Sequence, residues 1–361
     1  MTDSAPERTM ALGRAKAALP TDAPPGECRI SLYRSGERQH EAATLAEAHA
    51  AVRADPSLGV WVSLTEPNRD QLLEAAREFD LPRLAVEDAI VAHQRPKAEI
   101  YGDVFFLVLR PAAYDEREET VRVGEVHVFG KSDVVITVRH DPSVDVERIR
   151  ARLEANPHLM GHGALGVIYA VLDRVVDDYA PVVAALQEDI DEVESAVLSG
   201  ARNASRRTYR LAREIILLQR AVYPLGRVLE EIMAPLDRPE RFGPNMPKPG
   251  ESHRDELREH LRDVADHVAS AQDHVEGFRQ LLGNIMTVES NLVDRAQNEA
   301  MKKVSSWGGI LVVPTLIASI FGMNIAPQPG FHWVFSWPLV LTFMFLSSLL
   351  LYLLFRRNDW L

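Results

Sequence analysis

The chain of 361 residues is poor in cysteine and in basic charge, and it lacks the usual nucleotide-binding motif. Its single cysteine, Cys28, excludes an internal disulfide and agrees with a reducing compartment. The formal charge of −12 argues against nucleic acid as a partner, because phosphate binding requires a basic surface. No G-x-x-x-x-G-K-[ST] occurs, and no nucleophile with its base stands out. We therefore expect neither an ATP-driven pump nor an enzyme.

Charge is also missing from one long segment near the C-terminus. Charged residues make up 25% of the chain, yet none falls between Lys303 and Arg356. The gap divides into two apolar runs, 304–323 and 336–355, and each is long enough as a helix to span a hydrocarbon core of ~30 Å. We predict two transmembrane helices joined by an extracytoplasmic loop, 324–335. A helical hairpin buried in a soluble protein is the alternative, which the absence of charge on every helix face disfavours.

The flanks of these two runs predict their orientation. Lys302 and Lys303 precede the first run, and Arg356 and Arg357 follow the second. By the positive-inside rule, residues 1–303 and the tail 356–361 are cytoplasmic in a multi-pass protein of the cell membrane. The N-terminus has no apolar core of a secretory signal. The first run is rich in small and hydroxylated residues, which suit a helix that packs against others or lines water.

The polar part of the chain changes character twice. Residues 1–26 are rich in Ala and Pro and predict a disordered tail. Residues 27–144 predict an α/β domain, with strands at 28–34, 60–64, 104–110, 125–130 and 133–139 and a helix at 68–79. Residues 145–303 predict a helical domain and stalk, including helices at 164–199, bent at Pro181, and at 205–233. The fold class is therefore α+β, an α/β sandwich followed by helices.

The stalk is predicted to continue into the first apolar run. Residues 251–301 contain no proline, so one helix over 251–323 would be on the order of 110 Å long. Apolar residues recur along it at spacings of three and four, which is typical of a packed helix face. They are Leu261, Val264, Val268, Ala271, Val275, Phe278, Leu282 and Ile285.

Two sets of polar residues have the spacing of metal ligands on a helix. Asp263, His267, Ser270 and His274 fall on one stalk face, and carboxylate and imidazole at such spacing can hold a divalent cation. His158 and His162 form an H-x-x-x-H pair. In both cases a solvated polar face is the simpler interpretation, and the His pair stays unassigned.

A resemblance to a known family begins at the end of the first apolar run. Gly322-Met323-Asn324 resembles the signature of the CorA family of magnesium and cobalt channels. Residues 84–110 are similar to that family's L-x-x-E-D-x-x-x-x-x-Q-R-P-K segment and following strand. "VVDDY" at 175–179, "RDVADH" at 262–267 and the terminal "WL" also fit, so the resemblance covers residues 27–361.

The resemblance implies a funnel-shaped homopentamer whose first spans line a pore, with Mg²⁺ as transported and regulatory ion and Co²⁺ as a further transported ion. It assigns pore and selectivity roles to Gly322, Met323, Asn324, Thr315 and Asn298. It assigns a narrow apolar constriction to Met301, Val304, Gly308 and Val312. It assigns regulatory binding of Mg²⁺ between subunits to Asp88 and Asp263, with Glu87, Asp177, Asp178 and His267 as neighbours. The simpler alternative makes Asp88 a helix cap and Asp263 a solvated stalk acid.

Physical chemistry supports the pore roles. Mg²⁺ releases inner-shell water reluctantly, so a ring of Asn324 amides can select it through the hydrated ion. Gly322 is expected to permit a sharp exit from the helix, and Met323 to serve packing. The loop after Asn324 lacks the acidic residues usual in the family, which lowers cation attraction and makes Zn²⁺ harder to exclude. His332 adds an imidazole there, although an interfacial His beside Trp333 is the simpler interpretation.

Two other functions stay open at this stage. The zinc-transporting branch of the same superfamily has this architecture, although the Gln94-Arg95-Pro96-Lys97 and Glu87-Asp88 matches favour the magnesium branch. A membrane-anchored interaction or sensor protein that conducts nothing is the second alternative. The small residues of the first apolar run favour a pore over such an anchor.

Overall fold

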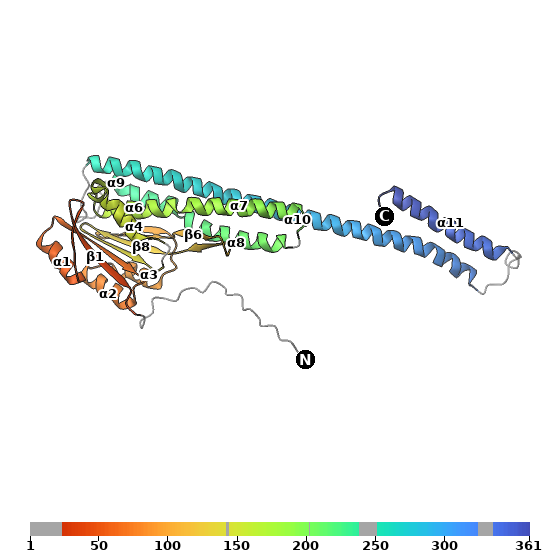
Figure 1. Ribbon diagram of the computed structural model, residues 1–361, viewed down its shortest axis with the longest axis horizontal. Helices are drawn as coiled ribbons and strands as arrows, with labels where there is room; N and C mark the ends of the chain where they lie inside the picture. Colours follow the sequence, from red (N-terminus) through yellow and green to blue (C-terminus); the bar gives the residue numbers. More distant parts are fainter. Residues whose placement is uncertain (1–23, 142–143, 202, 238–250, 324–334) are drawn as a thin grey trace. The chain divides into compact units, whose positions relative to one another are not determined.

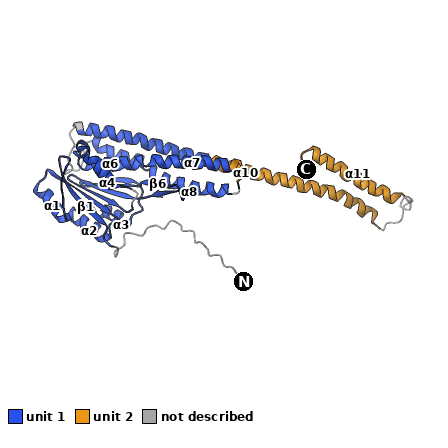
Figure 2. Cartoon of the chain, viewed as in Figure 1, with its two compact units in different colours: residues 1–196, 202–282 blue, residues 197–201, 283–361 orange. Residues whose placement is uncertain are grey.

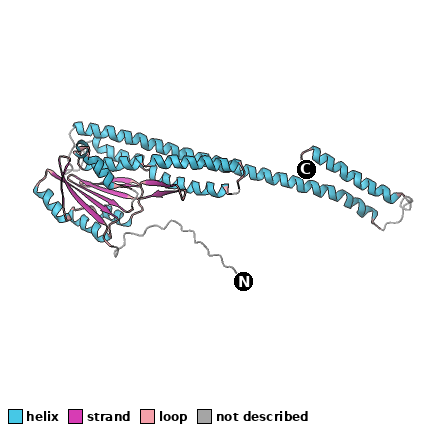
Figure 3. Cartoon of the chain, in the orientation of Figure 1, coloured by secondary structure: helices cyan, strands magenta, loops and turns pink. Residues whose placement is uncertain are grey.

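The computed structural model describes residues 24–141, 144–201, 203–237, 251–323 and 335–361. The chain divides into two compact units, shown in Figure 2. The first comprises residues 1–196 and 202–282, and the second comprises residues 197–201 and 283–361. Figure 3 shows that the strands belong to the first unit, while the second is helical.

A mixed sheet of seven strands forms the centre of the first unit. Its strand order is β2-β1-β3-β9-β8-β5-β4, and all neighbours are antiparallel except β3 and β9. The strands are β1 Glu27–Arg34, β2 Glu37–Glu41, β3 Leu58–Thr65, β4 Lys97–Tyr101, β5 Val104–Leu109, β8 Val126–Lys131 and β9 Val134–Arg139. The five predicted strands are confirmed as β1, β3, β5, β8 and β9. A hairpin of β6, Ala112–Asp115, and β7, Thr120–Val123, forms a second small sheet.

Three helices cover one face of the sheet (Figure 1): α1 Leu45–Ala54, α2 Arg69–Glu78 and α3 Arg83–Val91. The sequence begins α2 with a capping box, in which Asn68 and Gln71 exchange side-chain and backbone hydrogen bonds. Alternate strand residues such as Val62 and Ile136 point to these helices and form one core with them. The helix predicted over residues 68–79 is confirmed.

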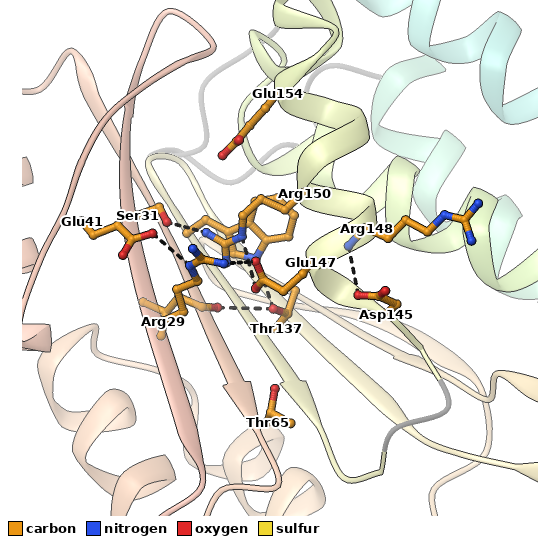
Figure 4. A network of polar contacts seen from close by, with 12 residues as sticks. Arg29, Ser31, Glu41, Thr65, Thr137, Asp145, Glu147, Arg148, Arg150 and Glu154 are labelled. Carbon is orange, nitrogen blue, oxygen red and sulfur yellow. Dashed lines mark hydrogen bonds and ion pairs between the residues drawn. The ribbon is translucent and has the colours of Figure 1, made fainter.

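The opposite face of the sheet packs against α4, Val146–Glu154, and α6, Ala164–Asp177, with the short α5, Pro157–Met160, between them. Arg150 of α4 is buried on this face, where its guanidinium lies 4.4 Å from the Trp61 ring centroid. Its Nη1 donates to Ser31 Oγ at 2.6 Å, in the polar network of Figure 4. Glu147 of the same helix pairs with Arg29 of β1. These contacts fix the start of the helical layer on the sheet.

The helical layer differs from the prediction at two breaks. The segment predicted as 164–199 is α6 and α7, Tyr179–Leu198, and the break falls at Asp178. Pro181 therefore lies in the first turn of α7, where its missing N–H costs nothing, and the predicted bend at Pro181 is wrong by position. The segment predicted as 205–233 is α8, Ala204–Val222, and α9, Leu225–Asp237. Pro224 separates these two helices, because it cannot continue the backbone hydrogen bonding of α8.

The predicted stalk helix is confirmed as α10, Glu251–Phe321, 71 residues long. All eight residues of its predicted apolar stripe are buried. The last helix, α11, spans Ser336–Arg357. Two described helices, α10 over its apolar part and α11, are long and apolar enough to cross a membrane.

Candidate functional site

One face of α10 packs against the C-terminal segment within the second unit. Ser306 is fully buried and its Oγ donates to Lys302 O at 2.7 Å, and Ile310 is buried one turn further on. A Cβ built on Gly309 would lie 3.5 Å from Phe355 Cε2 of α11. Ser306, Gly309 and Ile310 therefore define the face of α10 that α11 covers.

The positions predicted to line a pore lie on another face of α10. Met301, Val304 and Val312 are 58%, 68% and 61% exposed, although they are apolar. A Cβ built on Gly308 would meet no atom within 4 Å. Asn298 and Thr315 are exposed as well, and Thr315 Oγ1 donates to Leu311 O at 2.7 Å. Since their spacings are three or four residues, these six positions form one continuous stripe along the helix.

Gly322 and Met323 of the Gly-Met-Asn motif directly follow Phe321, the last residue of α10. Gly322 N–H donates to Ala318 O at 2.8 Å, so the helical hydrogen bonding continues through it. Gly322 is not among the described glycines with a positive φ, so the expected sharp exit does not come from a left-handed glycine. Met323 is exposed. Asn324, His332 and most of the predicted loop lie outside the described residues.

Asp88, one of the two predicted regulatory carboxylates, lies inside α3 and accepts from a lysine. Lys97 Nζ lies 2.7 Å from Asp88 Oδ2 and 2.6 Å from Glu99 Oε2. The N-cap position of α3 is Pro82, so the alternative that Asp88 caps this helix is wrong. Glu87, its neighbour, is exposed. Lys97 belongs to the Gln-Arg-Pro-Lys segment, so its ion pair joins that segment to Asp88 of the Glu-Asp pair.

A buried carboxylate that the sequence did not reveal holds this segment in place. Glu125 accepts from His93 N–H at 2.6 Å and from Gln94 N–H at 3.2 Å, and His127 Nε2 lies 2.7 Å from its Oε1. Burial opposes ionisation of Glu125, but these hydrogen bonds and the nearby Arg110 guanidinium outweigh it and lower the pKa of Glu125. Ala92 and His93 both have positive φ, which costs about 1–3 kcal/mol each. The Glu125 hydrogen bonds offset this strain and aim the Gln94–Lys97 segment at α3.

The remaining predicted regulatory residues gather between α6 and α10. His267 Nδ1 of α10 lies 3.5 Å from Asp177 Oδ1 of α6, and Asp178 pairs with Arg174 at 2.6 Å. Burial raises the pKa of Asp178, although Arg174 opposes the shift. Asp263, on the same α10 face, is close enough to raise the pKa of the buried Asp173, whose shift comes first from burial and then from Asp177. Asp173, four residues before Asp177, was not predicted from the sequence.

The four-residue stalk face does not assemble as one ligand set. His267 turns to Asp177, while His274 Nδ1 lies 2.7 Å from Ser270 O of its own helix. By contrast, the unassigned His158 and His162 come together with Glu256 of α10. Among the described residues, this is the one group of three His, Cys, Asp or Glu side chains that could hold a metal ion, with ligand atoms within 4.8 Å of one another.

Comparisons with known proteins show the family and the fold that this chain shares with others. The family described as CorA-like Mg²⁺ transporter protein matches residues 58–357. The cobalt/magnesium transport protein CorA of Thermotoga maritima is 27% identical over 310 residues, which cover 85% of each chain. The magnesium transport protein CorA of Salmonella typhimurium is 23% identical over 319 residues, 84% of this chain and 92% of that one. The complete structure of the CorA magnesium transporter from Methanocaldococcus jannaschii has a similar fold, with a TM-score of 0.65, 16% identity and coverage of 92% and 98%.

Proposed function

The chain belongs to the family of CorA-like Mg²⁺ transporter proteins, and from this premise we propose that it conducts Mg²⁺, and also Co²⁺, into the cytoplasm across the cell membrane. The Thermotoga maritima relative is named a cobalt/magnesium transport protein, and the Salmonella typhimurium relative is named a magnesium transport protein. The transported ion is the substrate of the pore, which we propose is formed by five copies of α10 in a homopentamer.

The observation that carries this proposal is the uncovered stripe on α10. The six positions from Asn298 to Thr315 face away from α11, and the apolar ones are exposed in a single chain. In a membrane, lipid tails or other copies of the chain can cover an apolar stripe, so it is the polar and small residues within the stripe that favour a pore. Asn298 and Thr315 supply polar groups at intervals along an otherwise apolar stripe. This pattern suits a pathway that holds a hydrated ion weakly and lets it leave.

The proposed membrane topology follows the same positive flanks. Lys302 and Lys303 stand before the apolar part of α10, and Arg356 and Arg357 close α11, so both termini are placed in the cytoplasm. The segment between the helices then lies outside the cell, with Asn324 at the outer mouth of the pore. A neutral amide there binds water of the hydrated ion without holding the ion itself.

Control by cytoplasmic Mg²⁺ is the second part of the proposal. Asp88 on α3 and Asp263 on α10 are proposed to meet across a subunit boundary, where two carboxylates repel unless a cation lies between them. With Mg²⁺ bound the subunits are held together and the pore is closed. When Mg²⁺ falls, repulsion loosens the ring and the pore opens. The acids around Asp177 add negative charge that favours the cation.

Ion uptake into liposomes tests the function. The purified chain is reconstituted with a Mg²⁺ indicator inside the vesicles, and Co²⁺, Ni²⁺ or Zn²⁺ is added outside as competitor. We expect Mg²⁺ uptake that Co²⁺ reduces by competition. Zn²⁺ uptake without Mg²⁺ uptake would instead favour the zinc-transporting alternative. A chain that inserts correctly but passes none of these ions would be a non-conducting membrane protein.

A further inference from the structure

Four histidines and one glutamate gather at the beginning of α10, within the first unit. His158 lies in α5 and His162 follows it, while His253, Glu256 and His260 occupy successive turns of α10. None of the five belongs to the proposed pore or to the proposed carboxylate site. The two segments are about ninety residues apart in the sequence, so the fold, not the local spacing, brings them together.

The distances within this cluster fit a single small cation. His158 Nδ1 lies 3.0 Å from Glu256 Oε1, and His162 Nε2 lies 3.5 Å from Glu256 Oε2. Ligand atoms about 2.0–2.1 Å from a tetrahedral metal ion are roughly 3.3 Å from one another. The His253 ring centroid lies 4.9 Å from that of His162 and 5.8 Å from that of His158, which brings a further imidazole close to both. His260 Nε2, at 4.0 Å from Glu256 Oε1, lies at the edge.

His162 is the member of this cluster whose ring nitrogens could bind a metal ion. Its side chain is only 1% exposed, and both ring nitrogens are buried without a hydrogen-bond partner. A buried imidazole in this condition loses its bonds to water and gains none from the protein. A neutral imidazole carries a lone pair on one ring nitrogen, and this is the form that binds a metal ion.

We propose that His158, His162 and Glu256, completed by His253, form a binding site for a divalent transition-metal ion of the Zn²⁺ or Co²⁺ type. Imidazole nitrogen with one carboxylate is a ligand set that such ions prefer, whereas Mg²⁺ prefers oxygen ligands in octahedral geometry. The site lies within one chain, so it differs from the proposed Mg²⁺ site between subunits in both ligands and position. A bound ion would link α5 to the first turns of α10. Occupancy of this site would depend on the transition-metal concentration and not on that of Mg²⁺.

Metal binding by the full-length chain tests this proposal. The tag-free protein, carrying Cys28→Ser to remove its exposed thiol, is titrated with Zn²⁺ by calorimetry in excess Mg²⁺, and with Co²⁺ by visible absorption. We expect one site per chain that Mg²⁺ does not displace, with the intense Co²⁺ bands of tetrahedral coordination. His158→Gln and Glu256→Gln should each weaken this site by at least about tenfold.

The control is His274→Gln, which removes an imidazole from the same helix outside the cluster. His158 is 62% exposed, so its substitution leaves the fold intact and a loss of binding reports the site itself. Equal Zn²⁺ affinity in wild type, His158→Gln and Glu256→Gln would overturn the proposal, as would equal competition by Mg²⁺. Mg²⁺ flux into liposomes does not depend on this site, so failure here leaves the proposed transport function standing.

Discussion

Lys97 Nζ lies 2.7 Å from Asp88 Oδ2, so a cation of the chain itself already occupies one side of the proposed regulatory carboxylate. Burial works to lower the pKa of Lys97, but hydrogen bonds to Asp88 and Glu99 outweigh it and raise the pKa. The ammonium therefore stays charged at neutral pH. A Mg²⁺ ion that binds Asp88 between subunits must compete with Lys97 or share Asp88 with it.

Removing that competitor should strengthen regulation. We expect Lys97→Gln to shift protection of the first unit from proteolysis to Mg²⁺ concentrations about 1.4- to fivefold lower, since a partly exposed ion pair is worth about 0.2–1 kcal/mol. The matched control is Lys131→Gln, which breaks the Lys131–Asp103 pair elsewhere on the sheet. Unchanged or higher Mg²⁺ requirement in Lys97→Gln would mean that Asp88 does not bind the regulatory ion.

Removing the charge of both proposed Mg²⁺ ligands should weaken regulation. Asp88→Asn with Asp263→Asn keeps the side-chain shapes but removes the two charges, so higher Mg²⁺ should be needed for the same protection from proteolysis. Mg²⁺ flux through the proposed pore should persist, because neither residue lies in the stripe from Asn298 to Thr315 on α10. Asp70→Asn with Asp273→Asn makes the same charge change at exposed positions and is the control. If the two double variants are protected from proteolysis at the same Mg²⁺ concentrations, Asp88 and Asp263 do not bind the regulatory Mg²⁺.

The hydropathy pattern predicted the strands and helices in which apolar residues recur at a regular spacing or form a continuous run. The five predicted strands are buried runs of β-branched and aromatic residues, and the stripe of α10 keeps its spacing for eight positions. The missed strands lack such a signal: every residue of β2 is exposed, and β4 is only partly buried. Pro224 alone indicated a break between two helices. The break was not predicted because apolar residues continue at helical spacing from α8 into α9.

Site residues were predictable where the sequence keeps them in one motif. Asp88 and Lys97 lie in one segment, so their ion pair could be expected. Glu125 could not be found in this way, because a carboxylate inside an apolar strand pattern gives no sign of the backbone N–H groups that it will meet. The His162 cluster depends on packing between α5 and α10, and only the fold brings Glu256 to the H-x-x-x-H pair.

Glu125 provides a prediction for the pH dependence of stability. Its pKa is lowered in the fold, so its contribution is full above the ordinary glutamate pKa of about 4.3 and is lost as pH falls through the lowered value. Glu125→Gln should reduce the free energy of unfolding by about 2–3 kcal/mol at neutral pH, because an amide oxygen replaces a charged acceptor of several hydrogen bonds.

Thermal unfolding of the full chain in detergent at several pH values checks this expectation. The deficit of Glu125→Gln should be largest near neutral pH and shrink in acid, where the wild type has lost the same contribution. Glu116→Gln, at an exposed turn position, should show no deficit at any pH. A deficit of constant size across the range would assign the effect to shape and not to the carboxylate charge.

The proposed filter leads to a flux prediction. Asn324→Ala removes the amide that is proposed to bind the hydrated ion, so Mg²⁺ uptake into liposomes should be abolished. Assembly should be unaffected, which size-exclusion chromatography with light scattering measures. Asn358→Ala, at the C-cap of α11, makes the same substitution far from the proposed filter and should keep wild-type uptake. Normal uptake by Asn324→Ala would exclude the amide as the selective group.

Two adjacent glycines of α10 should respond in opposite ways to the same substitution. Gly309 faces the Phe355 ring, where even a Cβ would lie 3.5 Å from Cε2, so Gly309→Leu should separate α10 from α11 and lower the thermal stability of the chain in detergent. A Cβ built on Gly308 would meet no atom within 4 Å beyond the adjacent residues and the backbone of its own helix, so Gly308→Leu should leave stability and assembly near wild type. If five copies of this stripe line the pore, the added leucines narrow it and uptake of Mg²⁺ falls steeply. Each variant thus serves as the other's control. Wild-type flux through a folded, assembled Gly308→Leu protein would show that this face of α10 contacts lipid and not the conduction path.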